Sequence, residues 1–425
     1  MRTRTFAGAV TAGVALTLLH VTPAVAAAGD LDTSFSSNGK EKVDAASGAV
    51  DVAIQSNGKI VAVGSDGTKM VVVRLTTNGT LDPAFSGDGV LHVGFGNGGE
   101  SEASGVAIVD SDIVVVGTHF PDSSTGDVKM AVARIDSDGT LDDTFSSDGK
   151  ELFDLSGDTR GGDVAVQSNG RIVCVGRDGH DLLVVRFLSD GTPDPSFDGD
   201  GSITTSFTDD VEGMAVAIDP GTQEILAGAT HVVSGQTEDF VIARYTTTGT
   251  LDDTWSDDGK RTAQTTSEGG LQSLVVDSSS RVVAVGSTES SSHGFQFVVR
   301  RFDNDGTSDD SWSDDGVVQA GFKRGGESAD DFAFDVVLQS NGKVLVAGTS
   351  LDGDREFAVM RFTTDGHLDH GFGGSDGAVL TSFNQQAGAN ALDIDDSNGR
   401  IVVVGNAIKD DLSLDGMELA RYLGS

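Results

Sequence analysis

The chain has 425 residues, with 66 acidic against 28 basic side chains and a formal net charge of −38 at pH 7. A surface this acidic repels nucleic-acid phosphates and anionic lipid headgroups, so we expect neither as a partner; it favours solubility, cation association or a basic partner. The single cysteine, Cys174, excludes a disulfide framework within the chain and lies in the strand-like stretch IVCVG. We therefore expect a buried, inert thiol there.

The first 26 residues are typical of a secretory signal peptide. Arg2 and Arg4 precede an apolar run over residues 6–19, and Ala24-Val25-Ala26 forms a small-residue cleavage site. The apolar run is too short for a membrane anchor. We expect residues 27–425 to be secreted without membrane insertion, and to fold as one monomeric domain.

Short strands and turns follow the signal segment. Residues 50–55 and 59–64 are apolar strands on either side of the turn Ser56-Asn57-Gly58, and a third strand is expected over residues 70–75. A more polar fourth strand follows over residues 90–95. No stretch shows sustained helical periodicity, so the sequence predicts an all-β protein.

The connection after the third strand repeats at intervals of 50 to 60 residues. Each copy has an arginine, an aspartate eight residues later, an aromatic residue three further on, and a closing glycine. The six complete copies pair Arg74 with Asp82, Arg134 with Asp142, Arg186 with Asp194, Arg244 with Asp252, Arg301 with Asp309, and Arg361 with Asp369.

Two fragments at the ends of the chain complete a seventh copy. Asp32 has no arginine before it, and Arg421 has no aspartate after it. Complementary halves are typical of a closed ring, whereas an open β-solenoid, the alternative architecture, would show atypical capping repeats. We expect a seven-bladed β-propeller with four antiparallel strands per blade, closed by strand exchange. The polar segment 39–44 should form the outer edge of the last blade, beside the C-terminal strands.

The repeated arginine and aspartate have a structural interpretation. A guanidinium that reaches its aspartate would fix each linker, and the aromatic residue would fill the gap between neighbouring blades. Seven copies of one pair indicate architecture more simply than seven ligand sites, so we expect an ion pair between Arg421 and Asp32 as well.

The pattern VxxQSNGKIVxxG followed by VVRxxxxGTLDxxFxxDG resembles the delta-60 repeat, a bacterial repeat grouped with β-propeller domains of unknown function. The resemblance covers nearly all of residues 27–425. The fourth and fifth copies depart from it, with Pro220-Gly221-Thr222 and Ser278-Ser279-Ser280 in place of the turn. The resemblance implies a fold and no activity.

Calcium is an alternative for two linkers. Asp136-x-Asp138-Gly139-x-x-Asp142 and the matching run from Asp303 to Asp309 are similar to the calcium loops of integrin-type propellers. Asp-Gly is also common turn chemistry, and the last aspartate of each run is already paired with a repeated arginine. We therefore expect no cofactor, with calcium as the open alternative.

Four histidines are weak candidates for ligand contact. They fall between the second and third strands of four consecutive blades, which predicts loop positions on one face of the propeller: His119, His180, His231 and His293. A shared metal or catalytic site is one interpretation of them, and scattered surface histidines are the other.

Sialidase chemistry is not expected, because the two tyrosines, Tyr245 and Tyr422, each follow a repeated arginine at a core position.

Two functions remain open. The first is a non-catalytic binding or scaffolding module that recognises a carbohydrate, peptide or protein through the face with variable loops. The alternative is a hydrolase or lyase that acts on a polysaccharide at the mouth of the axial channel, with a buried acidic pair of raised pKa as its expected signature. Its carboxylates would come from a scattered set, namely Asp209, Asp210, Glu212, Asp330 and Asp331.

Overall fold

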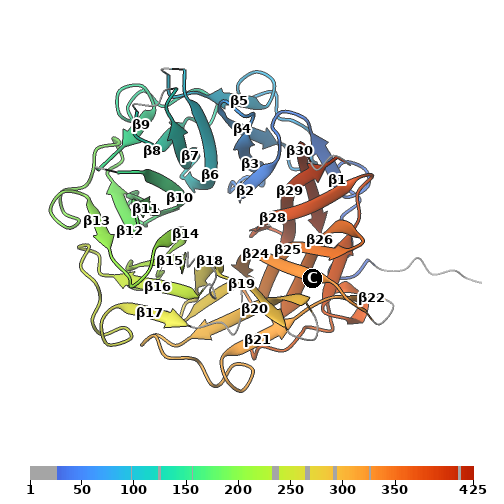
Figure 1. Ribbon diagram of the computed structural model, residues 1–425. Helices are drawn as coiled ribbons and strands as arrows, with labels where there is room; N and C mark the ends of the chain where they lie inside the picture. Colours follow the sequence, from blue (N-terminus) through green and yellow to red (C-terminus); the bar gives the residue numbers. More distant parts are fainter. Residues whose placement is uncertain are drawn as a thin grey trace, which may run out of the picture.

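The computed structural model describes residues 26–96, 98–122, 126–155, 157–231, 239–263, 269–290, 294–324, 327–409 and 413–425. These residues form seven four-stranded antiparallel sheets, arranged as blades around a central axis (Figure 1). The predicted seven-bladed β-propeller is therefore confirmed. No helix of the described residues is long and apolar enough to cross a membrane.

Each blade uses its strands in the same radial order. The innermost strands of blades 1 to 7 are β2 (Ala49–Ile54), β6 (Glu100–Val109), β10 (Thr159–Val166), β14 (Val211–Ile218), β18 (Leu271–Val276), β24 (Asp330–Leu338) and β28 (Gln386–Asp395). The second strands are β3 (Ile60–Ser65), β7 (Asp112–Phe120), β11 (Ile172–Asp178), β15 (Ile225–His231), β19 (Val282–Ser290), β25 (Val344–Asp352) and β29 (Arg400–Ile408).

The third strands are β4 (Met70–Leu75), β8 (Lys129–Ile135), β12 (Asp181–Phe187), β16 (Phe240–Tyr245), β20 (Gly294–Phe302), β26 (Asp354–Phe362) and β30 (Leu414–Tyr422). The outer strands are β5 (Val90–Val93), β9 (Lys150–Phe153), β13 (Ser202–Thr205), β17 (Lys260–Ala263), β21 (Val317–Ala320), β27 (Ala378–Thr381) and, for blade 7, β1 (Lys40–Val43). The short strands β22 (Lys323–Arg324) and β23 (Glu327–Ser328) form a separate pair, and η1 (Gly373–Ser375) is a 3-10 turn.

The two ends of the chain close the ring together. Strand β1 pairs antiparallel with β30, with Lys40 opposite Ala420 and Val43 opposite Met417. The strand order in blade 7 is therefore β1-β30-β29-β28, which confirms both the predicted strand exchange and the outer position of the polar N-terminal strand.

The core lies between the blades. The linker aromatics such as Phe85 are fully buried, and Phe85 packs in one apolar cluster with residues of both blade 1 and blade 2. Cys174 lies in the middle of β11 and is buried, and burial raises the pKa of its thiol. The thiol is thus protonated and inert. Tyr245 and Tyr422 are also fully buried in the core.

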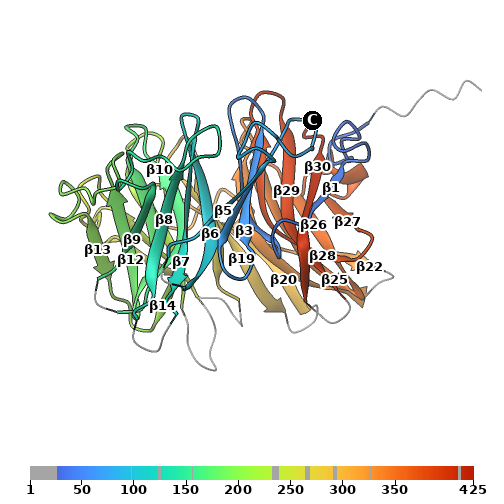
Figure 2. The same cartoon turned by 90° about the horizontal axis from the view of Figure 1, so that it is seen from above.

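The two faces of the propeller differ (Figure 2). The first hairpin turns and the linkers, such as residues 76–89, lie on one face, which we call the linker face. The connections from second to third strands and from blade to blade lie on the opposite face, the loop face. Because every inner strand begins at the loop face, its first residues surround the axis there.

Candidate functional site

The seven repeated arginines each lie beside the aspartate predicted for them. The nitrogen–oxygen distances are 2.8 Å for Arg74–Asp82, 3.1 Å for Arg134–Asp142, 2.9 Å for Arg186–Asp194, 3.3 Å for Arg244–Asp252, 2.7 Å for Arg301–Asp309, 2.6 Å for Arg361–Asp369 and 2.9 Å for Arg421–Asp32. The last pair joins the two ends of the chain.

Each arginine also reaches into the next blade. Arg74 Nη1 donates to the backbone oxygen of Ser137, 2.5 Å away in blade 2. The Arg421 guanidinium donates in the same way to the backbone oxygen of Thr77, so the set runs around the whole ring. The Arg421 guanidinium also lies over the aromatic ring of Phe35, with its central carbon 4.7 Å from the ring centroid. These contacts hold neighbouring blades together, which is an architectural role.

Five of the linker aspartates also pair with a second cation, contributed by a residue at the start of the second strand. The five cations are Lys59, Arg171, Arg281, Lys343 and Arg400. In blades 2 and 4 this position carries a carboxylate instead, Asp112 or Glu224, which pairs with the repeated arginine. The linkers of these two blades therefore have an excess of negative charge.

Cations and hydrogen bonds keep the linker aspartates ionised. Burial by itself would raise the pKa of Asp32, but hydrogen bonds from Ser34 and the charge of Arg421 lower it to about 2. Asp194 shows the same balance, with a pKa of about 2. A carboxylate held in this way is a structural group and a poor proton donor at neutral pH.

The predicted calcium loop of blade 2 is only partly assembled. Asp112, Asp136 and Asp142 each place one carboxylate oxygen within 4.8 Å of the others. Asp138, which belongs to the predicted loop, instead accepts hydrogen bonds from Thr140 in its own turn. In blade 5, Asp305 is likewise used within its turn, by Thr307. Calcium stays a hypothesis for the blade 2 group.

The prediction that the histidines lie in loops is wrong for two of them. His119 and His231 lie in strands β7 and β15, which continue beyond the corresponding strand of blade 1, and both side chains are buried. His119 shares a 3.0 Å hydrogen bond with Ser101, and burial lowers its pKa. The His231 ring packs against Phe207, with ring centroids 6.1 Å apart. These are packing positions.

The other two histidines do not join them. His180 lies in the exposed turn between β11 and β12, and its Nδ1 is 2.8 Å from the Asp210 carboxylate. His293 lies outside the described residues. The described histidines of the predicted set therefore do not converge on one site.

The carboxylates predicted for the enzyme alternative are also dispersed. Asp209 is exposed, Asp330 accepts a hydrogen bond from the backbone of Phe295, and Asp331 is buried and accepts one from Phe322. Only Glu212 of this set lines the axial pocket.

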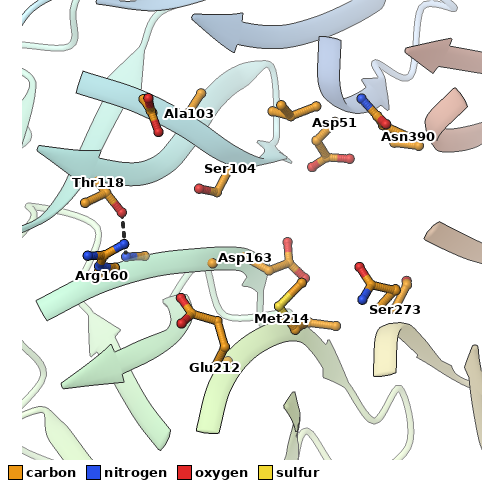
Figure 3. Close-up of a pocket in the computed structure, with 18 of the residues that line it drawn as sticks. Asp51, Ala103, Ser104, Thr118, Arg160, Asp163, Glu212, Met214, Ser273 and Asn390 are labelled. Carbon is orange, nitrogen blue, oxygen red and sulfur yellow. Dashed lines mark hydrogen bonds between the residues drawn. The ribbon is translucent and has the colours of Figure 1, made fainter. Parts of the chain in front are cut away.

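An axial pocket opens toward the loop face. It has a volume of about 560 Å³, and the inner strands of all seven blades contribute to its wall. Figure 3 shows Asp51, Ser104, Asp163 and Met214 pointing from different strands toward the same central space. A β-bulge at the start of each inner strand places these side chains, as at Val50, where the pairing with β3 shifts by one residue.

Four aspartates on the inner strands bond to the next blade around the ring, and we call Asp51, Asp163, Asp335 and Asp393 the axial carboxylates. Asp51 accepts from the backbone nitrogen of Val106 at 2.7 Å, and Asp163 accepts from that of Val216 at 2.8 Å. Asp335 and Asp393 accept in the same way from Leu392 at 2.8 Å and from Ile54 at 2.7 Å. The second oxygen of each carboxylate accepts from the residue that follows it.

The axial carboxylates have no cationic partner among the described residues, and their pKa values are raised. Burial is the largest cause, and it raises the pKa of Asp163 to about 7, that of Asp335 to about 6 and that of Asp393 to about 7. The pKa of Asp51 is also raised, by burial and by the charges of Asp163 and Asp335. At neutral pH this ring therefore carries partial negative charge.

The mouth of the pocket is charged on one side. Arg177 Nη1 is 2.8 Å from Glu212, and Asp158 pairs with both Arg177 and Arg160. The Arg160 guanidinium also lies over the ring of Phe120, 5.5 Å from its centroid. Arg160 and Glu212 occupy the same position in their blades, two residues before the bulge of the inner strand. In blades 1, 5 and 7 this position is a glycine, so the two sides of the mouth differ in charge and in side-chain size.

The sequence interpretation missed the axial carboxylates, although a signal was present. Asp51, Asp163 and Asp335 each stand four residues before the glutamine of a Gln-Ser-Asn-Gly turn. The other four blades carry different residues at this position. The aspartates therefore drew less attention than the linker arginine and aspartate, which occur in every copy.

Five segments of the chain match a family described as "Domain of unknown function (DUF5122) beta-propeller". The matched segments are residues 55–85, 112–145, 167–197, 225–254 and 339–372. They fall in blades 1, 2, 3, 4 and 6. A comparison with curated proteins gave no match.

Solved structures with the same architecture include two lyases. Virginiamycin B lyase from Staphylococcus aureus superposes with a TM-score of 0.52 at 10% identity, covering 90% of this chain and 98% of that chain. A polysaccharide lyase, PL25 ulvan lyase, gives a TM-score of 0.52 at 13% identity, covering 90% of this chain and 96% of its own. At these identities the likeness shows the fold alone. Five segments of the chain thus match the DUF5122 β-propeller model, and this match confirms the predicted resemblance to a bacterial β-propeller repeat of unknown function.

Proposed function

We propose that this protein is a non-catalytic binding module, which takes part of a carbohydrate, peptide or protein partner into the axial pocket from the loop face. The observation that supports it most is the pocket itself. Its volume of about 560 Å³ lies within the range typical of ligand sites, and its wall combines polar groups such as Ser104 with apolar ones such as Met214 and Phe334.

The hydrogen bonding of the axial carboxylates favours binding over catalysis. A general acid or base needs an oxygen free to exchange a proton with the substrate. Both oxygens of Asp51 and both of Asp163 already accept backbone hydrogen bonds, one from the next blade and one from the residue that follows in the same strand. Their raised pKa values then follow from their burial in an architectural role.

Thermal unfolding with a ligand panel tests this function. A ligand at 100 times its Kd stabilises the folded state by about 2.7 kcal/mol, so a true ligand should raise the Tm clearly. The panel should hold neutral, acidic and amino sugars together with basic and acidic peptides.

A pocket-filling variant separates binding in the axial pocket from binding elsewhere. Ser104→Trp should remove the rise in Tm, because it fills the mouth of the pocket. Ser189→Trp, an exposed serine of the linker face, is the matched control and should keep the rise. A rise that survives in Ser104→Trp would place the ligand elsewhere and contradict the proposal.

The enzyme alternative keeps one supporting observation, the raised pKa of Asp163 close to the axis. It predicts cleavage of a polysaccharide by the wild type, with new reducing ends or unsaturated products, and loss of that cleavage in Asp163→Asn. Binding of an oligosaccharide that is recovered intact would favour the binding module instead.

Export is a separate proposal. It is supported by the signal-like segment at residues 1–26, of which residues 1–25 lie outside the described part of the chain. Expression in a bacterial host should yield a mature protein outside the cytoplasm that begins at Ala27. Retention of Met1 on the recovered protein would contradict it.

A further inference from the structure

The axial pocket has an unbalanced charge. Three of the axial carboxylates line it, Asp51, Asp163 and Asp335, and Glu102 and Glu212 stand nearer the mouth. Among the described residues that line it, Arg160 is the one lysine or arginine, and it is already paired with Asp158. The pocket as a whole therefore favours a cationic occupant.

Glu102 differs from the other acidic residues of the wall. It lies near the start of β6, is exposed, and makes no ion pair or side-chain hydrogen bond within the described part of the chain. Glu212, by contrast, is 2.8 Å from the Arg177 guanidinium. The Glu102 carboxylate is thus available to a ligand at the mouth.

Apolar side chains lie next to the carboxylates. Val50 and Phe334 occupy the bulge positions of β2 and β24, directly before Asp51 and Asp335, and Met214 occupies that of β14. Because the inner strands run inward from the loop face, an entering group reaches these apolar residues before it reaches the carboxylates. An aliphatic chain that ends in a cation has matching chemistry along its length.

We propose that the axial pocket binds the side chain of a lysine presented by a basic peptide or protein segment, with its methylene chain against Val50, Met214 and Phe334 and its ammonium group among Asp51, Asp163 and Asp335. This inference rests on the proposed binding function and names the class of partner. The formal charge of −38 favours approach of such a segment, and the open mouth on the loop face gives it access.

Binding of this kind is linked to protons. An ammonium group lowers the pKa of carboxylates around it, so binding releases protons in the range where Asp335 and Asp163 titrate, near pH 6 to 7. The other titratable or charged groups nearby are Asp393 on β28, the Cys174 thiol on β11, and, at the mouth, Glu102, Arg160 and Glu212. The affinity should therefore increase as the pH rises from 5.5 to 7.5.

Isothermal titration calorimetry with matched short peptides tests the proposal. A peptide with one lysine between glycines should bind, while the same peptide with acetyl-lysine should bind at least tenfold more weakly because it has no charge. The lysine peptide should bind several-fold more tightly at pH 7.5 than at pH 5.5. Titrations in two buffers of different ionisation enthalpy should show proton release. 1,5-Diaminopentane as a second ligand distinguishes a free diamine from a peptide, and tighter binding of the diamine would contradict a peptide partner.

Variants localise the interaction. Glu102→Gln should weaken the lysine peptide about threefold to tenfold, whereas Glu100→Gln, the same charge change on the same strand outside the pocket wall, should leave the affinity unchanged. Asp163→Asn, with its folding checked by thermal unfolding, should reduce the proton release. Equal binding to wild type, Glu102→Gln and Ser104→Trp would indicate general attraction to the acidic surface and overturn the inference.

The two proposals fail in different ways. If a neutral or acidic saccharide binds the wild type and is blocked by Ser104→Trp while the lysine peptide does not bind, the binding function stands and the lysine inference is wrong. If no compound of the panel is affected by Ser104→Trp, the binding function itself is wrong.

Discussion

Two rings of aspartates hold this propeller together, and they differ in their electrostatics. In the outer ring, on the linker face, each aspartate has an arginine partner, as Asp32 has Arg421. In the inner ring, around the axis, aspartates such as Asp163 accept backbone hydrogen bonds and have no cation beside them in the part of the chain that the structure describes. The pKa is lowered to about 2 for Asp32 and raised to about 7 for Asp163. Aspartate thus has two roles in this fold. In the outer ring an arginine neutralises it and the pair links neighbouring blades, whereas in the inner ring its charge faces the axial pocket.

The largest expected effect comes from breaking the outer ring where the chain closes. Arg421→Ala removes one of the two cations beside buried Asp32 and the bond to the Thr77 backbone. Because Arg400 still pairs with Asp32, we expect a loss of about 3 kcal/mol, the lower end of the range for breaking a buried pair. Chemical denaturation measures this. Lys42→Ala, which breaks a more exposed pair with Asp415 on the same blade, is the control and should cost much less, because solvent screens that pair. Equal losses of unfolding free energy in the two variants would show that burial does not make the Arg421–Asp32 pair more important than an exposed pair.

The two rings should oppose each other as the pH changes. Outer aspartates such as Asp32 and Asp194 have lowered pKa values, so their contribution to stability is present above about pH 4 and is lost as the pH falls toward 2. Axial carboxylates such as Asp163 have raised values, so their contribution is present below about pH 4 and is lost as the pH rises through 6 to 7. Stability should therefore decline on both sides of mildly acidic pH.

Asp163→Asn isolates the inner ring. Relative to this variant, the wild type should lose about 2 kcal/mol of unfolding free energy between pH 5 and pH 8, because only the wild type must ionise a buried carboxyl. Denaturation at several pH values gives this difference. A constant difference across the range would mean that Asp163 titrates normally in the folded protein.

The smallest effect concerns the outer ring of blade 2, where Asp112 replaces the second cation. Asp112→Lys recreates the arrangement of Lys59 and Asp82 and should stabilise the fold by about 0.5 kcal/mol, with less gain at high salt. Thermal unfolding is the measurement, and Lys59→Asp is the reverse change with the opposite sign. A calcium-dependent rise in Tm that Asp112→Lys abolishes would instead make the group with Asp136 and Asp142 a metal site.

The ring architecture could be predicted because its determinants repeat. The arginine at the end of the third strand and the aspartate eight residues later fix the blade boundaries, and the unpaired Asp32 and Arg421 predicted closure. Their interaction lies within one linker, so spacing along the chain is enough to find it. The bonds from each arginine to the next blade could not be seen in this way, since they join residues about 60 positions apart.

Spacing marks three of the axial carboxylates, but it could not show that they face one pocket. Asp51, Asp163 and Asp335 occupy equivalent positions in three blades, and only the bulge at the start of each inner strand directs them to the axis. The error over His119 and His231 has a related cause. The hairpins of blades 2 and 4 extend further toward the loop face than that of blade 1, so residues expected in loops are paired in strands. Strand length depends on pairing, which the repeat pattern does not encode.

The pairing of β1 with β30 also sets an order of events during synthesis. Residues 40–43 leave the ribosome long before their partner strand, Leu414–Tyr422, does. All four strands of blades 1 to 6 are synthesised before blade 7 can be completed. Until then the sides of blades 1 and 6 that face blade 7 have no complete neighbour. The ring can therefore close only after β30 has been made and has paired with β1. A chaperone that holds β1 unpaired until β30 has been made would delay this closure.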